Sequence, residues 1–432
     1  MISENNFKNS ERSSTEILKK FLLLTALYIS QGVSAGFVVV ALPVLLRLRG
    51  ESLEVIGWAG LLSWPWVLKF LWGPLVDRFY SPKFGARRTW ILPLQLMVSL
   101  ILFILAVKGK GEALTPLLIL IVLMNIATSL LDVATDAYAT DMLLPNERGW
   151  GNGIQIGGFY VGSIIGGGFF LIFKEWIGTE SAFCLLGIAV LLPVWLLKTN
   201  HEINRTSIIR TREAGFRKFF ERPIAKYALI IIVLLDLGEN FGVSMLSPFL
   251  VDGGLSSEEI GWLLGTGGMV AGLCGAATAG ILLNKLPPYR SLIIFSILQT
   301  VGMIGYIIVA KTGIVNITIA GCVIGIQYLV SNMFNVALYT CFMGWTSAKQ
   351  VATDFSIMAC VHNATFLVAT PLAGYSVKTF GYTGHFALAC LLSFFGISIA
   401  TRIISNGQLS LMSHEGYQKT EIDTNAVGVK LK

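Results

Sequence analysis

Charged residues are scarce in this chain. They make up 13% of its 432 residues, whereas a soluble domain carries about 25%. Hydrophobic residues account for 54% of the chain, and the mean hydropathy is +0.71. This composition excludes an ordinary soluble domain. It predicts an all-α membrane protein, because a segment that crosses the hydrocarbon must satisfy its backbone hydrogen bonds internally.

Several patterns that carry chemistry are also missing. The sequence has no G-x-x-x-x-G-K-[ST] motif, so we expect no phosphate-binding loop and no direct use of ATP. The six cysteines lie in apolar runs without a C-x-x-C pair or a histidine at metal spacing, so we expect no disulfide, no metal and no cofactor. The four histidines are scattered and offer no convergent nucleophile and base. We therefore do not expect an enzyme, and we do not expect a sensor because a sensor would carry an additional soluble domain.

Long apolar runs are what the chain does have. A bilayer needs about 20 apolar residues per helix. The first run follows a polar stretch that ends in Lys19-Lys20, is too long for a signal peptide and has no cleavage site after it. We expect twelve transmembrane helices, at residues 21–46, 54–76, 90–108, 115–138, 150–173, 181–198, 225–250, 259–283, 291–310, 314–343, 351–376 and 383–404.

The basic residues predict the orientation of these spans. Of the 32 Lys and Arg residues, Lys69 lies within a span and 24 lie in the two tails and in every second loop. The opposite loops hold the other seven, which are Arg47, Arg49, Lys108, Lys110, Lys174, Lys311 and Lys378. The positive-inside rule then places both termini in the cytoplasm. It also accounts for the net charge of +7 without nucleic acid as a partner.

The longest loop, from Lys198 to Arg222, divides the spans six and six. A weak repeat supports this division, because Gly73-Pro-Leu-Val-Asp77-Arg78 has a counterpart in Gly280-Ile-Leu-Leu-Asn284-Lys285. Internal repeats of this kind are typical of secondary transporters. We expect a cytoplasmic tail at 1–20, a six-helix bundle at 21–198, a cytoplasmic loop at 199–223, a second six-helix bundle at 224–404 and a cytoplasmic tail at 405–432.

Glycine recurs at helical spacing in two of the expected spans. These residues are Gly158, Gly162 and Gly166 in the fifth span and Gly268 and Gly272 in the eighth. Small residues four apart let two helices approach closely in a membrane. We interpret both runs as packing surfaces.

Ionisable groups inside the spans are few, and each costs about 2.5–3.5 kcal/mol at a helix centre. Lys69 lies eight residues before Asp77, and Asp132 lies nine before Asp141, so the two are expected at similar depth. Lys69 can pair with Asp132 or with Asp136. These two carboxylates share a helix face, so one of them can hold a proton near neutral pH. The group either binds substrate or protons, or is a structural latch.

The seventh span carries Asp236 and Glu239 one turn apart. Like-charge repulsion and desolvation favour a proton on one of them. We expect Glu239 to carry it and Asp236 to position Glu239, although both acids could simply face water. Asp354 and His362 lie in the eleventh span. His362 can titrate near neutral pH, or it can be a hydrogen-bonded packing residue.

The stretch from Gly73 to Arg88 reads Gly-Pro-Leu-Val-Asp-Arg-Phe-Tyr-Ser-Pro-Lys-Phe-Gly-Ala-Arg-Arg. It resembles the loop signature between the second and third helices of the major facilitator superfamily, although any short cytoplasmic loop collects basic residues. The resemblance implies that the glycine permits close helix contact and that the Asp pairs with a neighbouring helix end. It implies a gating role for Gly73, Asp77, Arg78, Arg87, Arg88, Glu147 and Arg148.

Further motifs across residues 20–400 resemble a narrower group, the siderophore permeases of the rhizobactin and pyochelin type and, more distantly, the anhydromuropeptide permeases. These motifs are Gln31-Gly32, Ala41-Leu-Pro-Val-Leu-Leu-Arg47, Ser63-Trp-Pro-Trp-Val-Leu-Lys69, Arg87-Arg-Thr-Trp-Ile-Leu-Pro-Leu-Gln95, Asp132-Val-Ala-Thr-Asp136-Ala-Tyr-Ala-Thr-Asp141, Glu147-Arg-Gly149, Gly238-Glu239 and Pro248-Phe-Leu-Val-Asp252. The second half departs more, since Asn284-Lys285 replaces the Asp-Arg pair.

The resemblance implies a monomeric importer in the bilayer of the bacterial inner membrane. The fifth span lacks the Gly-Pro signature of drug-exporting antiporters, which favours import. A ferric siderophore is the first cargo that it suggests, taken up with protons. The alternative is an anhydromuropeptide or another amphipathic anion such as an acyl-CoA.

Overall fold

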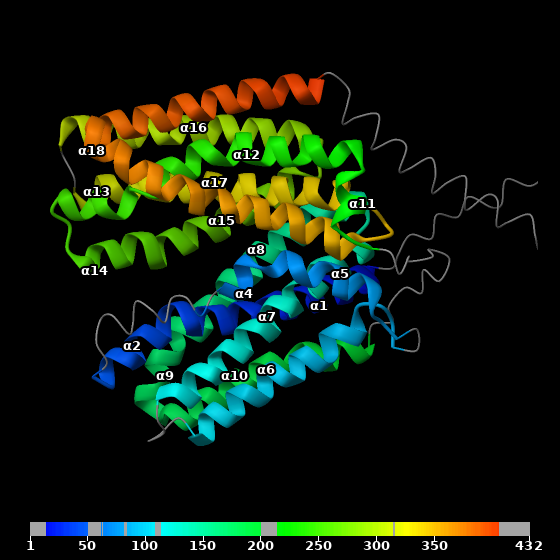
Figure 1. The fold of residues 1–432 in the computed structure, drawn as a ribbon. Helices are drawn as coiled ribbons and strands as arrows, with labels where there is room; N and C mark the ends of the chain where they lie inside the picture. Colours follow the sequence, from blue (N-terminus) through cyan, green and yellow to red (C-terminus); the bar gives the residue numbers. More distant parts are fainter. Residues whose placement is uncertain are drawn as a thin grey trace, which may run out of the picture. The chain divides into compact units, whose positions relative to one another are not determined.

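A computed structural model describes residues 14–50, 62, 64–81, 84–108, 114–199, 214–313 and 316–405 (Figure 1). These residues are almost entirely helical, and the β pairing among them is limited to one isolated bridge, Ser81 with Gly85. The first part of the expected second span, most of the central loop and most of both tails lie outside the described residues.

The first part of the chain forms helices that are interrupted by short 3₁₀ and π segments. The α-helices are α1 (Ser14–Gly36), α2 (Leu42–Leu48), α4 (Trp64–Val67), α5 (Trp72–Arg78), α6 (Arg88–Lys108), α7 (Leu114–Met142), α8 (Arg148–Ile164), α9 (Phe170–Ile177) and α10 (Thr179–Thr199). The interruptions are the π segments Phe37–Ala41 and Ile165–Phe169 and the 3₁₀ segments Lys69–Leu71 and Pro145–Glu147.

The second part begins with a short helix and continues with long ones. Its helices are α11 (Phe216–Phe220), α12 (Pro223–Val243), α13 (Leu246–Asp252), α14 (Ser257–Ile260), α15 (Gly268–Leu282), α16 (Pro288–Thr312), α17 (Ile317–Trp345) and α18 (Val351–Ser405). A π segment, Gly261–Gly267, joins α14 to α15. Proline opens α12 and α16, where its missing N–H costs nothing. The Asn316 side chain caps α17 by accepting from Ile319 N–H.

Ten of the described helices are long and apolar enough to cross a membrane. The last of them, α18, is two helices joined at Gly381, whose φ of 66° lies outside the helical region. This break falls where the sequence separates the spans 351–376 and 383–404, and the chain reverses direction there (Figure 1). The all-α prediction is confirmed, and the helices extend a few residues beyond most of the expected spans.

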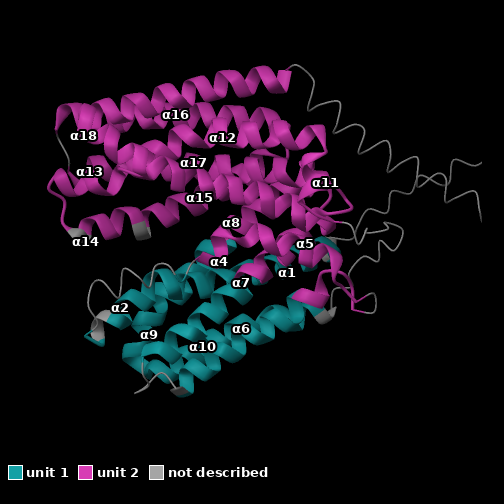
Figure 2. Ribbon diagram, viewed as in Figure 1, with its two compact units in different colours: residues 1–62, 91–128, 158–204 teal, residues 63–90, 129–157, 205–432 magenta. Residues whose placement is uncertain are grey.

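The chain forms two compact units, which Figure 2 shows in different colours. Unit 1 contains residues 1–62, 91–128 and 158–204, and unit 2 contains 63–90, 129–157 and 205–432. The boundaries of these units fall within α7 and α8, so they differ from the six-and-six division. That division stays a prediction. Every side chain of the site described below belongs to unit 2.

Glycines of α8 and of the following π segment, Ile165–Phe169, lie in close contact with α1 within unit 1. A Cβ on Gly162 would lie 2.1 Å from the Ile29 carbonyl oxygen, and one on Gly166 would lie 1.9 Å from that of Val33. In unit 2, a Cβ on Gly268 would lie 2.8 Å from the Tyr328 ring. The glycine runs therefore act as packing surfaces, as the small-residue spacing predicts.

Candidate functional site

Lys69 and Asp132 form a buried ion pair. The Lys69 Nζ lies 3.0 Å from Asp132 Oδ2, and the two side chains are only 7% and 9% exposed. The spacing in the sequence left open whether Lys69 pairs with Asp132 or with Asp136. In the structure the ion pair is with Asp132, and Lys69 lies at a break in its helix.

That break is a 3₁₀ segment, Lys69–Leu71, between α4 and α5. Ser129 of α7 anchors both sides of it, because its hydroxyl donates to the Pro65 carbonyl at 2.7 Å and accepts from Trp72 Nε1 at 3.2 Å. Short 3₁₀ stretches within a longer helix often mark hinges at functional sites.

Asp136 has a different neighbour. Gln155 of α8 donates from Nε2 to Asp136 Oδ1 at 2.8 Å, and both side chains are buried. We call Lys69, Asp132, Asp136 and Gln155 the Lys69 cluster. The amide of Gln155 lies in the Gly-rich stretch of the fifth expected span, where the sequence indicates packing alone.

Asp236 of α12 contacts His362 of α18. The Asp236 Oδ2 lies 2.7 Å from His362 Nδ1, and the carboxylate is buried. The sequence presents His362 as a lone histidine in an apolar helix, but the structure gives it a carboxylate partner. A carboxylate fixes the orientation and tautomer of an imidazole and stabilises its protonated form.

Glu239 lies one turn beyond Asp236 and has its own partner. Its Oε1 accepts a hydrogen bond from the hydroxyl of Ser331 on α17. Its Oε2 is buried, and the Gln327 side chain of α17 also interacts with this carboxyl. We call Asp236, Glu239, Ser331 and His362 the His362 cluster. Each acid of the expected pair is therefore held by a different helix.

The gating stretch meets the start of α18. Asp77 accepts hydrogen bonds from Ala352 N–H at 3.2 Å and from the Thr353 N–H and hydroxyl at 2.8 Å each. A carboxylate at a helix N-terminus satisfies free backbone N–H groups and interacts favourably with the helix dipole. A Cβ on Gly73 would lie 2.7 Å from Thr353 Cα, so glycine is needed for this approach.

Arg87 links Asp77 to the end of α7. Its Nη1 donates to Asp77 Oδ1 and its Nε to Asp141 Oδ2, both at 2.9 Å. Burial by itself would lower the pKa of Arg87, but the carboxylates of Asp141 and Asp77 outweigh burial and raise that pKa above its ordinary value. Arg87 therefore remains charged and holds two acids in place.

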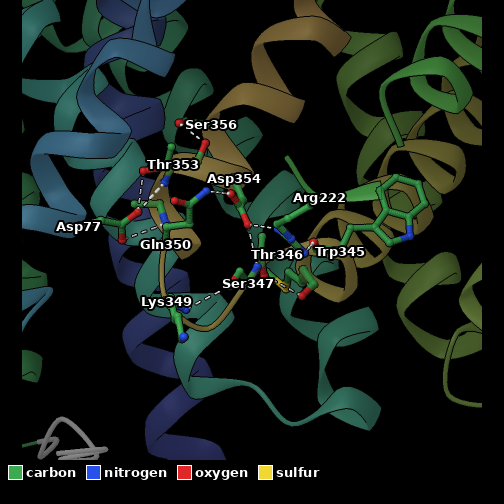
Figure 3. Close-up of polar contacts among 12 residues, drawn as sticks. Asp77, Arg222, Trp345, Thr346, Ser347, Lys349, Gln350, Thr353, Asp354 and Ser356 are labelled. Carbon is green, nitrogen blue, oxygen red and sulfur yellow. Dashed lines mark hydrogen bonds and ion pairs between the residues drawn. The ribbon is translucent and has the colours of Figure 1, made fainter. Parts of the chain in front are cut away.

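Asp354, in the first turn of α18, is a second buried acid near Asp77 (Figure 3). Asp354 accepts from Arg222, from Ser347 N–H at 2.7 Å and from Gln350 Nε2 at 2.6 Å. Figure 3 shows Thr353 directed towards Asp77 and Asp354 directed towards Arg222. Adjacent residues of α18 thus connect the gating stretch to the start of α12.

The other predicted gating residues occupy different positions. The Arg78 Nε donates to the Ala214 carbonyl, just before α11. Glu147 accepts from Leu144 N–H at 2.8 Å and caps the turn before α8. Arg88 and Arg148 begin α6 and α8. The structure thus brings Gly73, Asp77 and Arg87 together at α18, and the gating role of all seven residues stays a prediction.

The sequence interpretation missed Gln155, Ser331 and Arg222 as members of these groups. Gln155 and Ser331 are neutral, so the search for ionisable groups passes over them. Arg222 sits in a loop that is rich in basic residues, where nothing distinguishes it. The available signal was weak: a Gln in a run of glycines, and an Arg directly before the proline that opens α12.

The described residues thus combine apolar helices long enough to cross a membrane with buried charged groups on several of them. Residues 24–336 match the sequence profile of the Major Facilitator Superfamily. The chain belongs to this superfamily and is a multi-pass membrane protein of the transporter class.

Two relatives within this superfamily show which transporters the chain is similar to. The chain is 30% identical to the anhydromuropeptide permease of Escherichia coli (strain K12) over 346 residues, which cover 78% of this chain and 70% of the relative. It is 25% identical over 398 residues to a Rickettsia conorii protein named putative transporter AmpG 4, with 88% and 95% of the two chains covered.

Solved structures agree on the fold. A bacterial homologue of the iron transporter ferroportin in the outward-facing state has a TM-score of 0.65 at 15% identity, with 90% of this chain and 99% of that chain covered. The superfamily transporter FucP in the outward conformation has a TM-score of 0.62 at 14% identity, with 88% and 98% covered. At these identities the likeness concerns the fold alone.

Proposed function

We propose that this protein is a secondary transporter that imports an anhydromuropeptide across the bacterial inner membrane. The observation that carries this proposal is the 30% identity to the Escherichia coli permease over 78% of this chain. The sequence motifs favour a ferric siderophore first and an anhydromuropeptide second. The relatives reported above support the second cargo, so we adopt it.

The Lys69 cluster is suited to an anionic cargo. A peptide carboxylate on the cargo can replace Asp132 as the partner of the Lys69 ammonium, which is 3.0 Å away in this structure. The exchange keeps the buried ammonium paired throughout, and this matters because an unpaired charge in a low dielectric costs several kcal/mol. Trp64 and Trp72 flank this stretch of helix and offer aromatic surface to the apolar part of the cargo.

The proton gradient is the proposed source of energy. Glu239 is the coupling group, because its carboxyl is buried and contacts the neutral hydroxyl of Ser331. The neighbouring Asp236–His362 pair can accept or release a proton as well. Intramembrane acids and histidines are common proton carriers in transporters.

Asp77 supplies the proposed gate. Its three hydrogen bonds hold the end of α5 against the start of α18. Alternating access in such transporters moves one bundle against the other. Opening at this end requires the loss of these contacts, so their strength sets the population of the open form.

Uptake in reconstituted vesicles tests the proposal. A radiolabelled anhydromuropeptide should accumulate when the vesicle interior is alkaline, and a protonophore should abolish the accumulation. A labelled ferric siderophore in a parallel assay should not accumulate. Accumulation of the siderophore but not of the anhydromuropeptide would contradict the proposed cargo and favour a ferric siderophore. Anhydromuropeptide accumulation that is unchanged by the protonophore would contradict proton coupling.

A further inference from the structure

The two polar clusters lie on helices that pack directly together within unit 2. The Cys360 thiol of α18 contacts the Val67 carbonyl of α4 at 3.2 Å. One turn earlier, a Cβ on Gly73 would lie 2.5 Å from Ser356 Oγ. The first part of α18 therefore runs along the broken helix that carries Lys69. His362 lies two residues beyond Cys360 on the same helix and faces Asp236 of α12 and Tyr339 of α17.

Tyr339 of α17 is a side chain that reaches both clusters. Its ring meets that of His362 edge to face, with centroids 5.8 Å apart, and stacks on Phe355, also at 5.8 Å. Its hydroxyl interacts electrostatically with charged groups from three other elements, namely Lys69, Asp132, Asp136 and Asp236. A further edge-to-face contact with Phe342, at 5.3 Å, helps to fix the ring, and the phenol group interacts electrostatically with charges of both clusters.

The polar neighbours described above serve one cluster each. Gln155 donates to Asp136, and Ser331 donates to Glu239 from a position two turns before Tyr339 on the same helix. Asn240 donates to Thr365 and extends the His362 side. Tyr339 is thus distinguished by interactions with both sides.

A phenol hydroxyl both donates and accepts hydrogen bonds. It can therefore donate to a carboxylate when a cation leaves, and accept from an ammonium or imidazolium when one approaches. We propose that the Tyr339 hydroxyl is a positioning group that joins the two clusters, so that the Lys69–Asp132 pair and the Asp236–His362 pair form and break together. This inference rests on the proposed function, because it assigns Tyr339 to the same transport cycle.

A double-mutant cycle tests the linkage without any cargo. Lys69→Met and His362→Asn are made singly and together, and the melting temperature of each purified protein is measured. In the native background, the loss of melting temperature in the double variant should differ by about 2 °C or more from the sum of the losses in the two single variants. In a Tyr339→Phe background, which keeps the ring contacts, the losses of melting temperature from Lys69→Met and His362→Asn should be additive. A Tyr375→Phe background is the control, because this exposed tyrosine of α18 makes the same chemical change elsewhere.

The same non-additivity with and without the Tyr339 hydroxyl would overturn the proposal, and so would additivity in every background. If Lys69→Met cannot be purified, Asp132→Asn takes its place in the cycle. In vesicles, Tyr339→Phe should retain downhill exchange of anhydromuropeptide but lose accumulation, and wild-type accumulation in this variant would also count against the linkage. A wild-type protein that takes up no anhydromuropeptide would contradict the proposed cargo, while the thermal cycle would still decide the role of Tyr339.

Discussion

At the scale of single residues, the Lys69–Asp132 pair makes the cost of a buried charge measurable. Lys69→Met leaves the Asp132 carboxylate buried without its cation and should destabilise the protein by about 3–5 kcal/mol. The double change Lys69→Met with Asp132→Asn removes both charges and should recover much of that loss. Expression level and melting temperature in detergent measure the effect.

The matched control is Lys69→Met with Asp136→Asn, because Gln155 rather than Lys69 donates to Asp136. This combination should recover little. Equal recovery with either partner would mean that Lys69 is shared between the two carboxylates.

Glu239 gives a prediction about coupling. An amide cannot release a proton, so Glu239→Gln should abolish accumulation of cargo and leave downhill exchange largely intact. Asp236→Asn should be milder, since an amide still hydrogen-bonds to His362. Accumulation against pH in reconstituted vesicles separates the two variants.

Glu259→Gln is the control for this change, because the Glu259 carboxylate accepts hydrogen bonds from Ser256, three residues earlier, and lies outside the His362 cluster. It should accumulate cargo as the wild type does. A Glu239→Gln variant with the wild-type pH profile would show that the coupling proton resides elsewhere.

The sequence alone predicts which residues are costly and offers Asp132 or Asp136 as the partner of Lys69, but it neither decides between them nor pairs Asp236 with His362. Lys69, Asp132 and Asp236 stand out because they are charged within apolar runs. Their partners lie 63 and 126 residues away, and no local rule connects positions so distant. His362 shows the difference clearly, since a lone histidine in the sequence is one half of a pair in the fold.

At the scale of helices, the contact between Asp77 and α18 predicts how the gate responds to charge. Asp77→Asn keeps the shape but removes the negative charge at the helix N-terminus. Hydrogen bonds to charged groups contribute about 1.5–3 kcal/mol, so opening should become at least about tenfold easier. The alkylation rate of a cysteine introduced by Ser356→Cys, at the contact with Gly73, measures this opening.

Asp252→Asn is the comparison variant, because Asp252 accepts from the Tyr382 hydroxyl at 2.5 Å rather than from the start of α18. Its alkylation rate should match that of the parent. An unchanged rate in Asp77→Asn would mean that Asp77 does not hold this contact closed.

The backbone conformation of Gly381 in α18 predicts that a side chain at this position destabilises the protein. Its φ of 66° and ψ of 176° suit glycine, and another residue there costs about 1–3 kcal/mol. Gly381→Ala should therefore lower the melting temperature. Gly374→Ala, where a Cβ would meet open space, should not lower it. Equal melting temperatures for the two variants would show that the turn adapts to a side chain.

The helices follow from the sequence more closely than their interruptions do. Long apolar runs can only be helices in lipid, so α6, α7 and α16 lie within a few residues of the expected spans. The 3₁₀ segment at Lys69 has no comparable signal, because Pro65 and Pro74 indicate a disturbed helix without fixing its form. That segment depends on Ser129, which belongs to another helix.

At the scale of the whole molecule, the distribution of basic residues predicts a topology. Reporter fusions at both termini and within residues 199–213 should give cytoplasmic signals. A fusion in the loop after α6, near Gly111, should give a periplasmic signal, because that loop carries few cations. A periplasmic signal from the central loop would reverse the orientation.

The contacts of Asp77 also have a consequence for the order of synthesis. Its partner Thr353 is made 276 residues later, which at roughly 5–20 residues per second is a delay of about 15–55 s. Its partner Arg87 follows after only 10 residues, and Asp141 joins Arg87 after a further 54. Arg87 can therefore neutralise Asp77 on the nascent chain while the start of α18 has yet to be translated.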